Sequence, residues 1–348
     1  PHLSAEAATI EPSTTIEVRL ADDLAAMLYT SGTTGRSKGA MLTHANLASN
    51  ALALHRIWRF EPGDVLLHVL PIFHVHGLFV ALHTAMLNAS TVLFLSRFSI
   101  DTTIGALRDA TVMMGVPTHY ARLLEDERFT AEQCANMRLF TSGSAPMSEA
   151  LHRAFTDRTG HRILERYGMT EAGMITSNPY DGDRVPGTVG FALPGVQVRV
   201  VDDDGQPCTA GDVGGVEVRG PNVFAGYWRL PDRTRDARRD GWFITGDVGS
   251  LDDEGRLRLE GRVGDMIISG GLNVYPRQIE LVLDEVVGVV ESAIVGVPDT
   301  DLGEAVTAVI VASEDPTIVQ DRIDRALGER LARFKHPKRC HFVELLPR

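Results

Sequence analysis

Short apolar runs alternate with helical patterns between residues 24 and 168 of this sequence. Runs of strand length occur at residues 65–70, 91–95 and 112–116, and amphipathic segments such as residues 44–59 lie between them. Strands that alternate with helices are typical of a mostly parallel sheet covered by helices. We therefore expect an α/β fold for residues 1–178.

The pattern changes after Pro179. Residues 196–201 and 215–219 alternate apolar with polar side chains, and the turn at residues 202–205 is rich in Asp and Gly. Such alternation indicates antiparallel strands with one face exposed to solvent. We predict an antiparallel β subdomain over residues 179–262.

The last part of the sequence, residues 263–348, combines two apolar strands with a helix that starts near Pro276 and a second helix at about residues 317–331. This composition predicts a small α+β domain with its own core. The glycine-rich segment 261–271 lies between two different strand patterns. We expect it to be the hinge between the domains.

Composition narrows the class of function. The 348 residues carry a formal net charge of −12, which argues against a nucleic-acid partner or an anionic membrane surface. The three cysteines are isolated and have no CxxC spacing, so the sequence predicts neither a disulfide framework nor a zinc site. No apolar run reaches about 18 residues, and residues 1–8 lack a targeting pattern. We expect a cytoplasmic protein that acts on small molecules, and no heptad repeat predicts its oligomeric state.

A loop rich in hydroxyl groups and glycine follows the apolar run at residues 24–29. Glycine lets backbone N–H groups approach an anion, hydroxyls add donors, and Lys38 adds a positive charge. Walker A spacing is absent, so the loop is not that of a P-loop NTPase. A surface turn is the alternative, but a loop after a strand of an α/β sheet lies where ligands bind. We predict that polyphosphate contacts Thr30, Ser31, Gly32, Thr33, Thr34, Gly35 and Lys38.

Five further motifs follow this loop. They read PIFHVHGL at residues 71–78, TSGSAP at 141–146, ERYGMTE at 165–171, WFITGD at 242–247 and GRVGDMIISGGLNVYP at 261–276. Together with the loop they resemble the adenylate-forming superfamily of acyl-CoA synthetases, luciferases and peptide-synthetase adenylation domains. Within it, the sequence is most similar to ligases that activate malonate or methylmalonate.

The resemblance implies a fold and a reaction. The fold is a large N-terminal domain, made of a parallel α/β lobe and an antiparallel β subdomain, followed by a small α+β lid domain. A carboxylate would attack the α-phosphorus of ATP with Mg²⁺ present, and the thiol of coenzyme A would then displace AMP from the acyl-adenylate. An adenylate-forming enzyme for another carboxylic or amino acid remains an alternative, as does a non-catalytic nucleotide-binding relative.

The resemblance also implies roles for residues. Thr170 would donate to the α-phosphate and Glu171 would hold Mg²⁺, while Lys38 and His74 complete the expected catalytic set. Asp247 would bind the ribose hydroxyls together with Arg262. The adenine slot would be formed by Gly143, Ser144, Ala145, Pro146, Glu165, Arg166, Tyr167, Gly168 and Met169.

For the acid, the resemblance points to His74, Val75, His76, Ser144 and Met174. A second carboxylate on the substrate needs a planar cation, for which arginine is the best match. We expect Arg122, placed at a strand-to-helix junction, to supply it. Arg166 is the second candidate, and a helix-surface role is the alternative for Arg122.

Gly270 and Gly271 would line the path of the pantetheine arm. The sequence departs from the family at both ends. Much of the N-terminal lobe would lie before residue 1, and the lysine loop that bridges acid and α-phosphate would follow residues 345–348. We expect the chain by itself to form the adenylate poorly.

Overall fold

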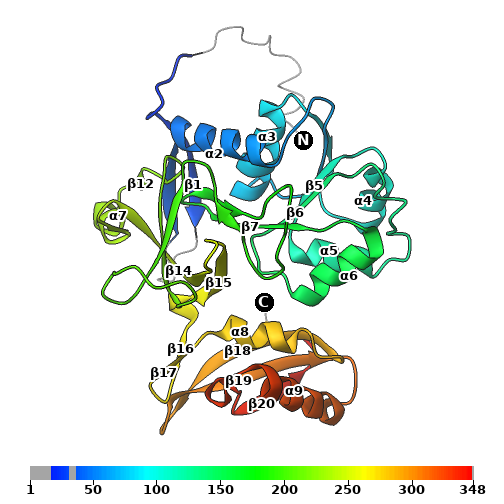
Figure 1. Cartoon of the computed structure of the whole chain (residues 1–348), viewed down its shortest axis with the longest axis vertical. Helices are drawn as coiled ribbons and strands as arrows, with labels where there is room; N and C mark the ends of the chain where they lie inside the picture. The colour runs from blue at the N-terminus through cyan, green and yellow to red at the C-terminus, as the bar shows by residue number, and fades with distance from the viewer. Residues whose placement is uncertain (1–16, 31–36, 347–348) are drawn as a thin grey trace.

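The computed structural model describes residues 17–30 and 37–346. Figure 1 shows a larger body that holds the elements up to β15 and a smaller body formed by the elements from β16 onward. In the described part of the chain, no helix has the length and apolar character needed to cross a membrane.

A seven-stranded sheet lies at the centre of the larger body, in the order β4-β3-β5-β6-β7-β8-β9. The neighbours from β4 to β7 are parallel, and β8 and β9 add to the edge in antiparallel fashion. The expected parallel α/β lobe is therefore confirmed. Its strands are β3 (Val65–His68), β4 (Thr91–Phe94), β5 (Val112–Gly115), β6 (Leu139–Ser142), β7 (Leu164–Met169), β8 (Gly173–Ser177) and β9 (Phe191–Ala192).

Helices cover both faces of this sheet. Successive residues of a strand point to opposite faces, so Leu66 packs in the core with Leu54 while Leu67 packs in the core with Phe155. Thr43 caps the helix that follows it through a reciprocal pair of hydrogen bonds with Asn46. The helices are α2 (His44–Ile57), η1 (His76–Leu82), α3 (His83–Leu87), α4 (Ile100–Leu107), α5 (Pro117–Leu124) and α6 (Glu149–Thr159).

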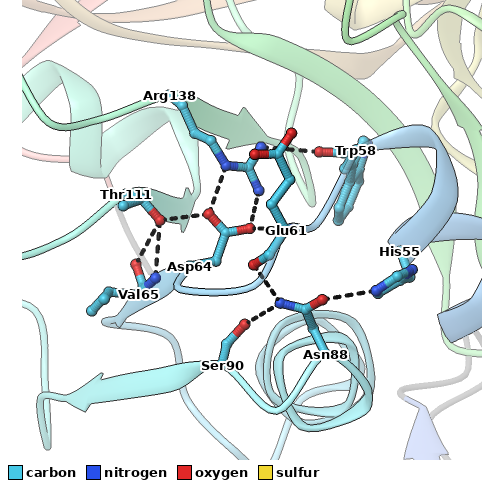
Figure 2. Close-up of polar contacts among 9 residues, drawn as sticks. All are labelled: His55, Trp58, Glu61, Asp64, Val65, Asn88, Ser90, Thr111 and Arg138. Atoms are coloured by element: carbon cyan, nitrogen blue, oxygen red, sulfur yellow. Dashed lines mark hydrogen bonds and ion pairs between the residues drawn. The ribbon is translucent and has the colours of Figure 1, made fainter.

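A buried ion pair joins three strand ends of this sheet (Figure 2). Arg138 donates from Nε to Oδ1 of Asp64 at 2.6 Å and from Nη1 to the carbonyl oxygen of Trp58 at 3.1 Å. Its Nη2 donates to the other oxygen of Asp64. Thr111 adds a hydroxyl donor to Asp64 at 2.8 Å. Charge and hydrogen bonds are therefore satisfied on both sides of the pair.

β1 (Leu24–Thr30) lies in a different place from the one we expected. It pairs antiparallel with β2 (Lys38–Thr43), and β12 (Gly226–Tyr227) completes a separate three-stranded sheet. The prediction that β1 ends at the edge of the parallel sheet is wrong. The connection at residues 31–37 is too short for the crossover that parallel strands need, so the two strands form a hairpin.

The second part of the larger body is a five-stranded antiparallel sheet, which confirms the expected β subdomain. It contains β10 (Gln197–Val201), β11 (Gly214–Arg219), β13 (Arg238–Arg239), β14 (Trp242–Leu251) and β15 (Leu257–Arg262), with the short helix α7 (Pro231–Asp236) beside it. β15 ends at Arg262, where we placed the domain boundary, and that boundary stays a prediction.

The smaller body is an α+β unit with its own apolar core. β18 (Val289–Asp299) pairs with β19 (Gly303–Ala312) along its whole length, and β20 (Arg339–Val343) runs parallel to β19. The remaining elements are η2 (Val263–Asp265), β16 (Ile267–Ser269), β17 (Leu272–Val274), α8 (Pro276–Leu283), α9 (Pro316–Arg330) and η3 (Arg333–Lys335).

Candidate active site

A cleft of about 610 Å³ lies between the two bodies. One wall comes from the ends of β6 and β7 and from β14 and β15, and the other from α8 and β18. Nine of the residues predicted for the site line this cleft: Ser144, Ala145, Pro146, Glu165, Arg166, Tyr167, Gly168, Asp247 and Arg262. Segments that are far apart in the sequence therefore meet at one pocket.

Asp247 is the fixed carboxylate of the cleft. It is 5% exposed, and its Oδ1 accepts a hydrogen bond from Nε of Arg262 at 2.7 Å. Its Oδ2 accepts from the hydroxyl of Tyr167. The Asp247 carboxylate raises the pKa of Arg262, and burial followed by this carboxylate raises the pKa of Tyr167. The ionised acid is thus held in place by two donors at the edge of the cleft.

A second polar centre is cationic and more deeply buried. The Nη2 group of Arg166 donates to Nε2 of His76, so a neutral His76 carries its proton on Nδ1. That Nδ1 lies 3.2 Å from the hydroxyl oxygen of Ser144, so the Nδ1–H group can donate a hydrogen bond to this oxygen. We call this chain, Arg166, His76 and Ser144, the cationic relay. It leaves the Ser144 hydroxyl hydrogen free to donate into the cleft.

The charge of the relay has no counterion among the described residues. Arg166 is 2% exposed, and its Nε and Nη1 atoms are buried without a hydrogen-bond partner. Burial lowers the pKa of Arg166 to about 9, and burial followed by the Arg166 charge holds the pKa of His76 well below its usual value. A buried cation of this kind is costly unless an anion compensates it.

The backbone around the relay is shaped for close contact. A Cβ atom on Gly143 would lie 2.2 Å from Nη1 of Arg166, so only glycine fits there. Ser144, which is next in the chain, has a left-handed φ of 67°. Non-glycine residues rarely adopt this conformation, and such strain is found most often at functional sites.

Arg122 and two histidines lie near the relay. The backbone N–H of His76 donates to Nδ1 of His74 at 3.0 Å. His119 interacts electrostatically with both His76 and Arg122, and burial followed by the Arg122 charge lowers its pKa to about 4. Arg122 is exposed in the last turn of α5, which corrects our expectation of a strand-to-helix junction. Arg122 and His74 do not line the cleft itself.

Glu165 contributes a buried carboxyl to the same cleft. It is 6% exposed, and Oε1 accepts a hydrogen bond from the backbone N–H of Gly187 at 3.2 Å. Burial raises the pKa of Glu165 to about 8. The group is therefore a neutral hydrogen-bonding side chain at neutral pH.

A third group surrounds Glu171, in the turn between β7 and β8. The Oε1 atom of Glu171 accepts a hydrogen bond from the hydroxyl of Tyr227 at 2.9 Å, and Nζ of Lys38 lies 4.7 Å from the ring centre of Tyr227. Within the described ranges, Glu171 pairs with no cation and no three His, Cys, Asp or Glu side chains form a metal site. A single free carboxylate suits Mg²⁺, which binds through one or two carboxylates together with phosphates and water.

The structure separates some predicted residues from the cleft. Gly270 and Gly271 form the exposed turn between β16 and β17, with φ values of 60° and 77°. Val75 and Met174 are buried below the site. Thr30, Gly143, Met169 and Thr170 do not line the cleft either. Ser31, Gly32, Thr33, Thr34 and Gly35 lie outside the described residues, so their roles stay predictions.

Sequence reasoning missed Tyr227 and His119. Tyr227 meets Lys38 because β12 pairs with β2, and pairing between distant strands leaves no local signal. His119 follows Pro117 in α5, and nothing in that segment distinguishes it from a helix-surface residue. The only local signal for Tyr227 is weak: it follows Gly226 in a strand of two residues.

Comparisons with known proteins agree with this geometry. Residues 3–228 match the family described as AMP-binding enzyme, and residues 278–348 match the AMP-binding enzyme C-terminal domain. The ATP-bound structure of MatB from Rhodopseudomonas palustris superposes with a TM-score of 0.95 at 54% identity, covering 99% of this chain and 69% of that protein.

Two curated relatives are both CoA ligases, but their names give different acid substrates. The malonate–CoA ligase of Arabidopsis thaliana is 37% identical over 95% of this chain. The long-chain-fatty-acid–CoA ligase of Yersinia pestis is also 37% identical, over 94% of this chain. The chain spans 59% of the length of each of these two relatives.

Proposed function

The chain belongs to the AMP-binding enzyme family, and from this premise we propose that it serves an AMP-forming acid–CoA ligase that activates malonate or methylmalonate. The observation that carries the choice of acid is the cationic relay, whose buried Arg166 has no counterion among the described residues. A short dicarboxylate would supply the missing negative charge with its second carboxylate.

The first half-reaction joins the acid to AMP. One substrate carboxylate attacks the α-phosphorus of ATP, the bond to the β-phosphate oxygen breaks, and pyrophosphate leaves. Tyr167 and Asp247 would hold the adenosine, while Thr170 and Lys38 would stabilise negative charge on the phosphates. Mg²⁺ held by Glu171 would neutralise phosphate charge when bound.

The second half-reaction forms the thioester. The thiol of coenzyme A attacks the acyl carbon of the adenylate, and AMP leaves. The cleft faces both bodies, so a change in their arrangement could admit the thiol. We propose that Gly270 and Gly271 line that path after such a change.

The second carboxylate of the acid is proposed to accept a hydrogen bond from the Ser144 hydroxyl. His76 and Arg166 behind Ser144 would polarise this donor and supply positive charge. Arg122 would add longer-range attraction and His74 would assist as a neutral hydrogen-bonding group, and we retain Arg122 as the second cation of the acid site. Monocarboxylic acids would leave the relay uncompensated and bind weakly.

The proposal is tested by pyrophosphate release from the full natural protein with a panel of acids. Malonate and methylmalonate should support turnover, whereas acetate, propionate and amino acids should support little. Turnover with amino acids alone would contradict the proposal, and so would ATP binding without turnover on any acid. Arg122→Leu should reduce activity on malonate more than on a monocarboxylate, and an equal loss on both would remove Arg122 from this role.

A further inference from the structure

Tyr227 lies between two groups of opposite charge. In the pairing of β12 with β2 it stands opposite Ala40, and Lys38 is two residues further along the same face of β2. The ammonium group of Lys38 lies 4.7 Å from the centre of the Tyr227 ring, well inside the range of a cation–π contact. The ring therefore holds Lys38 on one side.

The hydroxyl of the same side chain holds the carboxylate of Glu171. Its oxygen donates to Oε1 of Glu171 at 2.9 Å, and Tyr227 is 7% exposed. The hydroxyl donates to Oε1 of Glu171, and no described residue donates to the second oxygen of this carboxylate, which is left for another ligand.

The chain segment around Tyr227 also holds the turn that carries Glu171. The N–H of Tyr227 donates to the hydroxyl oxygen of Thr234 at 2.9 Å, and its ring packs edge-on against Phe224. The N–H of Phe224 donates to the carbonyl oxygen of Glu171 at 2.8 Å, and Asn222 donates to that of Ala172 at 2.8 Å. This segment thus binds the Glu171 turn through its backbone as well as through the Tyr227 hydroxyl.

We propose that Tyr227 is a positioning residue that keeps Lys38 and Glu171 apart and orients the Glu171 carboxylate toward Mg²⁺. Lys38 and Glu171 form no ion pair in the described structure, although Lys38 contacts the ring of Tyr227 and Glu171 its hydroxyl. A direct pair would cancel the positive charge needed for phosphate and the negative charge needed for the metal. The neutral ring separates them, so each stays available to MgATP. This inference rests on the proposed function.

The test is isothermal titration of this chain with ATP, once with excess Mg²⁺ and once with EDTA. The ratio of the two affinities is the Mg²⁺ enhancement. Tyr227→Phe keeps the ring and loses the hydroxyl, so the enhancement should fall about 10-fold, the usual effect of removing a group that orients a metal ligand. The affinity for ATP in EDTA should change by less than about twofold. Tyr227→Leu also loses the ring, so affinity in EDTA should fall as well.

Two controls separate positioning from folding. Tyr120→Phe removes another buried hydroxyl, which donates to the carbonyl oxygen of Thr141 at 2.6 Å, and it should leave the enhancement unchanged. In a Glu171→Gln background, Tyr227→Phe should cause no further loss of enhancement, because its target is gone.

The outcomes distinguish this inference from the proposed function. No ATP binding by the wild type, or binding without Mg²⁺ enhancement, would overturn the proposed function and this inference with it. A wild type with clear enhancement that Tyr227→Phe leaves intact would overturn the inference alone. An equal fall in both affinities for Tyr227→Phe would also overturn it, since that is the effect of a structural role.

Discussion

Two arginines of this protein, the half-buried Arg138 and the buried Arg166, differ in how their charge is compensated. Arg138 is bound to both oxygens of Asp64 (Figure 2), whereas among the described residues Arg166 hydrogen-bonds only to the neutral side chain of His76 and keeps two buried nitrogen atoms without a partner. Burial lowers the pKa of Arg138, but the hydrogen bonds and charges of Asp64 and Tyr180 together raise it above its usual value, while burial lowers the pKa of Arg166 to about 9. One arginine serves the fold, and the other is available to a ligand.

The comparison of Arg138 with Arg166 distinguishes a charge that stabilises the fold from a charge that we assign to ligand binding. A satisfied buried pair is strongly destabilised when one partner is removed, whereas replacing an uncompensated charge with an apolar side chain can be neutral or stabilising. A buried charged residue that binds a ligand is therefore expected to lower the free energy of unfolding of the ligand-free protein. The two arginines allow this expectation to be tested within one molecule.

The largest effect is expected from Asp64→Ala, which leaves the half-buried guanidinium of Arg138 without its carboxylate. The free energy of unfolding should fall by about 3–5 kcal/mol. Arg166→Met, in contrast, should leave it unchanged or raise it. Urea unfolding followed by circular dichroism measures the free energy of unfolding of both variants. If Arg166→Met proved as destabilising as Asp64→Ala, the proposed difference between the two arginines would be wrong.

The next largest effect is expected in the catalytic efficiency with malonate. Arg166→Met should lower kcat/KM for malonate by about 100-fold, as expected when one partner of a buried charge pair is truncated. Asp64→Asn is the matched control at the other arginine and should leave the ratio of malonate to propionate activity unchanged. Pyrophosphate release measures both. A loss that is the same for malonate and propionate would count against a role for Arg166 in selecting diacids.

A smaller effect is expected at the end of the relay. Ser144→Ala removes the hydroxyl that would donate to the acid, so KM for malonate should rise about 10-fold, as for a hydrogen bond to a charged group. Ser148→Ala removes the cap of α6 instead and should lower stability by about 1 kcal/mol without a change in KM. If the two variants behave alike in the kinetic assay, Ser144 does not contact the acid.

The smallest effect is a pH dependence at Glu165, the buried acid of the cleft. Its folded-state pKa of about 8 lies above the usual 4.5, so its proton favours the folded state, and this contribution is lost as pH rises from about 4.5 to about 8. Glu165→Gln should remove that part of the pH dependence. Above pH 8, ATP affinity should fall in the wild type and stay level in the variant. Parallel slopes in both proteins would contradict the raised pKa.

Sequence patterns predicted the parallel lobe, the β subdomain and the small α+β body because strand and helix periods are local properties. The family resemblance, and not these periods, predicted Asp247, Arg262, Arg166 and Ser144 as site residues; all four line one cleft, and their roles stay predictions. Neither the periods nor the resemblance predicted that β1 and β2 form a hairpin outside the parallel sheet, or that Tyr227 reaches Glu171. Those features depend on pairing between strands that are not neighbours in the sheet predicted from the sequence, and the local periodicity of a sequence contains no information about such pairing.

The central claim is that Arg166, which has no counterion among the described residues, receives one from the second carboxylate of the acid. Thermal unfolding of the chain with ATP and Mg²⁺, in the presence of either malonate or propionate, tests it most directly. The account predicts that malonate raises Tm of the wild type well above the value with propionate, and that Arg166→Met abolishes this difference. Equal stabilisation by the two acids, or a malonate effect that survives in Arg166→Met, would contradict the account.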